Sequence, residues 1–108
     1  MNLQFEVHGS PRSISEQVEQ YARALGHVTA LVVPWESSPA KLSMAVTAVK
    51  SDGWAIEHTN LGTITLTPAG DATRVAIVGD DLDHDQKAKL AALFDQFARD
   101  VQQRLGAQ

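Results

Sequence analysis

The chain has 108 residues, of which 44% are hydrophobic and 20% are charged, and it contains no cysteine. This length and composition predict one soluble globular domain spanning residues 1–108. The missing thiols exclude disulfides, cysteine nucleophiles and thiolate metal sites. The formal net charge is -4, and the nine basic residues are spread along the chain without a cluster. Because nucleic-acid binding needs a basic surface that meets the phosphates, we expect no nucleic-acid partner.

The sequence also argues against a membrane segment. No apolar run approaches the roughly 18 residues that a membrane-spanning helix needs. The N-terminal residues 1–6 lack the basic and long apolar regions of a signal peptide. We therefore expect no membrane insertion and a cytoplasmic location.

Two segments near the N-terminus have strand patterns. Apolar and polar side chains alternate over residues 3–7, which predicts a strand with one buried face. Residues 28–33 form a β-branched apolar run that Pro34 ends, and this run predicts a second strand. The following residues, 34–39, have the composition of a loop.

A helix is predicted between these strands, at about residues 13–25, and two starts compete for it. Ser10 is a suitable cap if Pro11 occupies the first helical position. Alternatively, Ser13 caps the helix and Glu16, three residues later, completes a capping box. The sequence leaves both starts open.

The middle of the chain alternates strand patterns with turn signals. The strand patterns cover residues 42–50, 54–58, 63–67 and 73–78. The turn signals are Ser51-Asp52-Gly53, Asn60-Leu61-Gly62 and Pro68-Ala69-Gly70-Asp71. Their regular spacing predicts an antiparallel meander.

The last predicted element is a long amphipathic helix at about residues 85–105. Its apolar stripe consists of Leu90, Leu93, Phe94, Phe97, Val101 and Leu105. On its outer side, Asp95–Arg99 and Asp100–Arg104 are spaced four apart, as ion pairs on a helix are. The complete pattern predicts an α+β fold of the form β-α-β(4-5)-α. In this fold an antiparallel sheet carries one short N-terminal helix and a long C-terminal helix on one face.

Three local patterns resemble the START-like helix-grip superfamily, which includes polyketide cyclases and lipid-transfer proteins. The segment Val7-His8-Gly9-Ser10-Pro11-Arg12-Ser13-Ile14 is similar to that family's strand-to-helix junction. The segments 62–68 and 70–75 are similar to its late hairpin, and the long closing helix fits as well. The resemblance implies a short START-like domain that grips an apolar ligand, and it carries no catalytic residues over.

Four side chains are candidates for a ligand site. Tyr21 lies on the inner stripe of the first helix, where it either packs in the core or lines a pocket. Trp35 lies in a loop, where it either contacts a ligand or partner or folds back on the core. Trp54 and His58 share one face of a strand, and His58 either meets a ligand or bonds to the backbone at the sheet end.

The acidic run at residues 80–85 is the one metal-like cluster that the sequence suggests. Asp81, Asp83 and Asp85 have the spacing that begins a calcium-binding loop. The sixth and twelfth positions are then Gln86 and Ala92, where such a loop requires glycine and glutamate. We expect these carboxylates to cap the last helix, and we expect no metal and no cofactor.

Three functional hypotheses follow. The first is a non-catalytic binding module for an apolar small molecule held between the sheet and the C-terminal helix. The second is a structural or interaction protein, a homodimer that uses an exposed strand edge or Trp35 as its contact. The third is a cyclase-like or isomerase-like enzyme with His58 as its base.

Overall fold

The computed structural model describes residues 2–38, 40–52, 55–79 and 87–106. The elements in chain order are β1 (Asn2–His8), α1 (Pro11–Leu25), β2 (Val28–Val32), the 3-10 turn η1 (Pro34–Glu36), β3 (Leu42–Asp52), β4 (Ala55–Ala69), β5 (Ala72–Gly79) and α2 (Lys87–Gly106). This order confirms the predicted α+β fold. Neither α1 nor α2 has the combination of length and apolar character that a membrane crossing requires.

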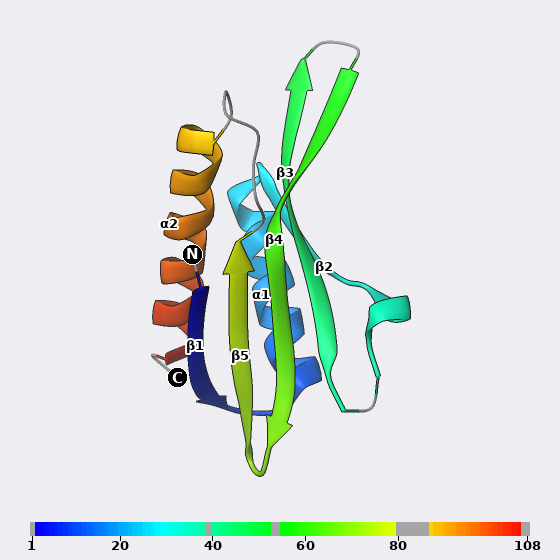
Figure 1. Ribbon diagram of the computed structural model, residues 1–108, viewed down its shortest axis with the longest axis vertical. Coiled ribbons are helices and arrows are strands. Elements are labelled where there is room, and N and C mark those ends of the chain that lie inside the picture. The colour runs from blue at the N-terminus through cyan, green and yellow to red at the C-terminus, as the bar shows by residue number, and fades with distance from the viewer. Residues whose placement is uncertain (1, 39, 53–54, 80–86, 107–108) are drawn as a thin grey trace.

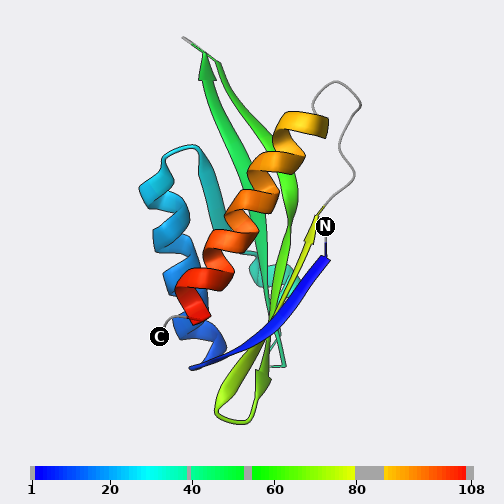
Figure 2. The ribbon, with the colours of Figure 1, turned by 90° about the vertical axis from the view of Figure 1, so that its left-hand side faces the viewer.

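The strands form one antiparallel sheet in the order β1-β5-β4-β3-β2. Both helices pack on the same face of this sheet, and within the described ranges no α-helix covers the opposite face (Figures 1 and 2). The alternation of side chains along the strands explains this arrangement. Ile64 and Leu66 of β4 point to the helices and are fully buried, whereas Thr63 and Thr65 lie on the open face.

Helix α1 begins at the first of the two predicted starts. Pro11 is its first residue, and the backbone N–H of Ser13 donates to the Ser10 hydroxyl oxygen at 3.2 Å. The missing N–H of proline costs nothing at this position, because the first helical N–H groups have no partner within the helix. Gly26 ends α1 with a φ of +82°, which is a left-handed conformation that glycine adopts without strain.

The predicted stripe of α2 seals the interior. Phe94, Phe97, Val101 and Leu105 are buried, and Leu90 and Leu93 pack at the margin of the same core. The stripe faces the buried side of the sheet, which confirms the expected docking of the C-terminal helix. This contact supplies the apolar burial that a lone helix of this length lacks.

The predicted turn at Asn60-Leu61-Gly62 is wrong, because β4 runs through it without interruption. The register with β3 shifts by one residue there: Val46 pairs with Gly62 and Thr47 pairs with Asn60. Leu61 is the extra residue of this β-bulge, and its side chain is buried. The strands predicted on either side of this signal are therefore both part of β4 from Ala55 onward.

Gly62 is required for close packing and not for a turn. A Cβ atom at this position would meet the carbonyl oxygen of Val78 and would lie 2.5 Å from Cζ of Phe94. Ordinary carbon–carbon contacts are about 3.5–4.0 Å, so no larger residue fits without a shift of the strand or the helix. The absence of a side chain at Gly62 lets α2 approach β4.

Candidate functional site

The layer between the sheet and α2, where the sequence places an apolar ligand, is occupied by protein side chains. Phe94 and Phe97 of α2 are buried there, and Met44 of β3 is buried in the same core. Large aromatic side chains fill such a layer at the density of an organic crystal. A ligand at this place would have to displace these side chains. An open site therefore lies at the surface and not in this layer.

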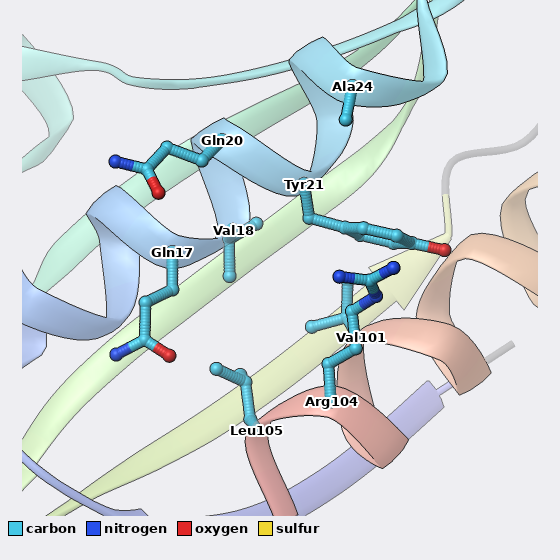
Figure 3. Close-up of a pocket in the computed structure, with 8 residues that line it drawn as sticks. All are labelled: Gln17, Val18, Gln20, Tyr21, Ala24, Val101, Arg104 and Leu105. Atoms are coloured by element: carbon cyan, nitrogen blue, oxygen red, sulfur yellow. The ribbon is translucent and has the colours of Figure 1, made fainter. Parts of the chain in front are cut away.

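An open groove lies between α1 and α2 (Figure 3). Its volume is about 270 Å³, and its lining residues are Gln17, Val18, Gln20, Tyr21 and Ala24 from α1, with Val101, Arg104 and Leu105 from α2. The buried side chains of Val18, Val101 and Leu105 form an apolar floor. Gln20 and Arg104 are exposed at the rim. An apolar floor with a few polar groups at its edge is the usual construction of a small-molecule site.

Tyr21 is held in this groove by three neighbours from α2. Its hydroxyl donates to Oδ2 of Asp100 at 2.9 Å, and its ring stacks on Phe97 with the centroids 5.7 Å apart and an interplanar angle of 11°. The guanidinium carbon of Arg104 lies 4.3 Å from the centroid of the Tyr21 ring. Gln96 donates to the other carboxylate oxygen of Asp100 at 2.9 Å. These contacts fix the orientation of the tyrosine ring.

The predicted ion pair between Asp100 and Arg104 is replaced by these contacts with Tyr21. In the part of the chain that the structure describes, the salt bridges are Arg23–Glu19 at 3.1 Å and Arg74–Glu6 at 3.2 Å. The spacing of Asp100 and Arg104 places both on the flank of α2 that faces α1. On this flank the hydroxyl of Tyr21 binds Asp100 and the ring of Tyr21 contacts Arg104. A solvent-exposed ion pair between Asp100 and Arg104 would contribute little to stability, so these contacts replace it.

The electrostatics of the groove keep Tyr21 protonated. Burial raises the pKa of the Tyr21 hydroxyl above its ordinary value of 10.0, and the hydrogen bond to Asp100 and the charge of that carboxylate act in the same direction. The cation of Arg104 opposes this rise in the pKa. At neutral pH Tyr21 is therefore a hydrogen-bond donor and a stacking surface, which suits ligand binding better than proton transfer.

The structure separates the candidate residues that the sequence groups together. Tyr21 lies in the groove, whereas Trp35 lies on η1, 84% exposed, at the far end of β2. Trp35 therefore does not fold back as a plug on the core. Trp54 is outside the described residues. The backbone of His58 pairs with Val49 in the β3–β4 ladder, and its side chain is not described.

The acidic run at residues 80–85, whose spacing resembles the start of a calcium-binding loop, also lies outside the described residues. Sequence reasoning missed the groove residues Gln17, Gln20, Ala24 and Arg104. They lie beside the apolar stripes of the two helices and not on them. No local signal identifies them, because the groove exists only where two helices from opposite ends of the chain meet.

Comparison with known proteins gives a fold but no family. No protein-family model matches the chain, and no curated protein sequence matches it. The chain is similar to the crystal structure of the vertebrate conserved region (VCR) of human METTL16, with a TM-score of 0.53 and 15% sequence identity over 94% of this chain and 98% of that chain. At this level of identity the likeness concerns the fold alone.

The resemblance to START-like helix-grip domains is thereby overturned. The structural match is to the METTL16 region, and no START-like family model recognises the sequence. The resemblance was carried by a strand-to-helix junction, a hairpin and a long closing helix. Such patterns are shared by chains with this order of elements, so they indicate an architecture and do not identify a family.

Proposed function

We propose that this protein is a non-catalytic binding module for a small molecule with an apolar body, and that the ligand lies in the groove between α1 and α2. The observation that carries the proposal is the pre-set ring of Tyr21 beside an apolar floor. The groove volume of about 270 Å³ lies just below the ~300–1,000 Å³ that ligand pockets occupy. A ligand the size of a single substituted ring therefore fits better than a lipid chain.

The rim of the groove favours a ligand with one polar end. Arg104 is the cation that the groove offers among the described residues, and its guanidinium lies over the Tyr21 ring. A planar ring that lies on the apolar floor of the groove can present a carboxylate to this guanidinium, which binds carboxylates through two parallel hydrogen bonds. We therefore expect aromatic carboxylates to bind more tightly than neutral hydrocarbons.

Thermal-shift measurements with a panel of single-ring aromatic carboxylates and their neutral analogues test the proposal. A ligand present at a hundred times its dissociation constant adds about 2.7 kcal/mol to the free energy of unfolding. The variant Ala24→Leu fills the groove from an exposed position and should lose this gain. The matched control Ala92→Leu makes the same change at an exposed position of α2 outside the groove and should keep it.

The proposal fails if no compound of the panel shifts the melting temperature of the unmodified protein. It also fails if Ala24→Leu responds to a ligand as strongly as Ala92→Leu does, because the ligand then binds elsewhere.

A second candidate function is that of a structural or interaction protein that acts as a homodimer. The observation that favours it is the exposed apolar surface at β2 and η1, where Trp35 is 84% exposed and Leu31 is 52% exposed. Native mass spectrometry tests it: a species of twice the 11.7 kDa chain mass is expected, and a monomer at all concentrations contradicts it. The enzymatic hypothesis based on His58 stays a prediction.

A further inference from the structure

Strand β2 is an edge strand of the sheet, and among the described residues no backbone hydrogen bond reaches its outer side. The N–H of Val33 donates to the carbonyl of Ser43 at 2.8 Å, and the N–H of Val49 donates to the carbonyl of His27 at 2.9 Å. The backbone groups of the odd-numbered residues of this segment therefore point toward β3. In an antiparallel ladder the direction alternates, so Val28, Ala30 and Val32 point their N–H and C=O groups away from the sheet.

This edge has none of the charged residues that usually protect an edge strand. Residues 24–35 contain no Asp, Glu, Lys or Arg, although the whole chain has a formal net charge of -4. The opposite edge, β1, carries the exposed carboxylate of Glu6. Two copies of an acidic chain repel each other, and the β2 edge is where they can meet without bringing charges together.

The exposed apolar side chains gather in the same segment. Four large hydrophobic side chains are exposed among the described residues, namely Leu25 (37%), Leu31 (52%), Trp35 (84%) and Val78 (47%). Three of these four fall between residues 25 and 35, and Leu25 and Trp35 are each five residues from Ala30. The segment thus has an exposed apolar side chain at each end, at equal distances in sequence from Ala30.

We infer that a second copy of this chain pairs with the β2 edge, antiparallel to β2 and about a two-fold axis at Ala30. This inference deepens the homodimer candidate above and rests on it. The register pairs Val28 with Val32 and Ala30 with the other Ala30, and each such pair exchanges two backbone hydrogen bonds. The five-stranded sheets of both copies then form one continuous sheet.

The same register places the exposed side chains against each other. Leu31 of one copy lies opposite Thr29 of the other on the open face of the sheet, where both side chains sit in the monomer. The Trp35 end of each segment meets the Leu25 end of its partner. A two-fold interface must be complementary to itself, and this register meets that requirement with apolar contacts at the centre and at both ends.

Sedimentation velocity over a dilution series, combined with amide hydrogen exchange, tests the inference. The unmodified protein should sediment as a dimer, and the amides of Val28, Ala30 and Val32 should exchange slowly. Leu31→Lys adds a charge near the centre of the seam, which is the interface between the two β2 edges. Trp35→Ala removes an apolar contact at each end of that interface. Each should raise the dimer dissociation constant by about tenfold or more, as loss of a central interface contact does. The three amides should then exchange fast.

Val78→Lys is the matched control, because it places the same charge on an exposed apolar position of β5 outside the seam. It should leave the dissociation constant unchanged. A dimer that resists both Leu31→Lys and Trp35→Ala, with fast-exchanging amides along β2, overturns the inferred seam and leaves the homodimer candidate standing. A protein that is monomeric throughout the series overturns both, and neither result touches the groove proposal.

Discussion

Helix α2 makes two contacts of different kinds. Toward the sheet it presents Phe94 and Phe97, which are buried, and the ring of Phe97 also stacks on Tyr21 of α1. Toward α1 it presents Asp100 and Arg104, which meet the single ring of Tyr21 and leave an open groove beside it. The layer beneath α2 is therefore closed by side chains, whereas the flank of α2 leaves an open groove, in which we propose that a ligand binds. The difference arises within one helix, from residues only a few positions apart.

The closed layer is tested most strongly by Phe97→Ala. Because Phe97 is 1% exposed, its truncation should leave a cavity and lower the free energy of unfolding by about 3–5 kcal/mol. Urea denaturation measures this change. The control Gln103→Ala on the exposed side of α2 should change stability by less than about 0.5 kcal/mol. If Phe97→Ala costs as little as the control, the layer is not closed.

The next largest effect concerns the close approach of α2 to β4. Gly62→Ala puts a methyl group into the Phe94 ring and the Val78 carbonyl, and we expect it to cost about 1–3 kcal/mol. Gly106→Ala makes the same substitution where nothing lies within 4 Å of the new atom, so it should be neutral or slightly stabilising. Equal effects of the two variants in thermal unfolding would mean that Gly62 is not a packing residue.

The apolar stripe of α2 and the bulge in β4 differ in whether the sequence predicts them. The apolar stripe of α2 is predictable because helical periodicity is a local property, and burial follows from it. The bulge at Leu61 is not predictable, since Asn60-Leu61-Gly62 has the composition of a turn and only the approach of Phe94 explains the glycine. Tertiary packing, and not the local sequence, decides between a turn and a bulged strand at these residues.

The groove between α1 and α2 could not be predicted from the sequence either. Its polar residues and Ala24 flank the apolar stripes, and their role depends on how α1 and α2 cross the sheet. Tyr21 was recognised as a candidate from its place on the inner stripe. The contacts of Asp100 and Arg104 with it were missed, because their spacing on α2 favours a pair with each other.

The contact across the groove is tested by Tyr21→Phe. This variant keeps the stacked ring but removes the hydroxyl that donates to Asp100 at 2.9 Å. We expect a loss of about 0.5–1.5 kcal/mol of stability, the net contribution of a typical intramolecular hydrogen bond. The double variant with Asp100→Asn should add little to this loss, since the partners share one interaction. Chemical denaturation of the four proteins measures the coupling, and fully additive losses would show that the two side chains act independently.

The smallest expected effect is the pH dependence of the stability that Tyr21 contributes, and the raised pKa of Tyr21 fixes its sign. Tyr21 is the one tyrosine of the chain, so absorbance of the phenolate reports its pKa without interference from another tyrosine. Because this pKa is raised in the folded state, the stability that the protonated hydroxyl contributes is complete below the unfolded value of about 10. It is lost as the pH rises through the folded pKa, so the advantage over Tyr21→Phe should shrink above about pH 10.

The neighbours of Tyr21 should move this titration in opposite directions. Asp100→Asn removes a negative charge that opposes ionisation and should lower the pKa of Tyr21. Arg104→Gln removes a positive charge that favours ionisation and should raise that pKa. A shift of the same sign in both variants would mean that the groove does not hold the carboxylate and the guanidinium on one ring. The flank of α2 would then be an ordinary solvent-exposed helix surface.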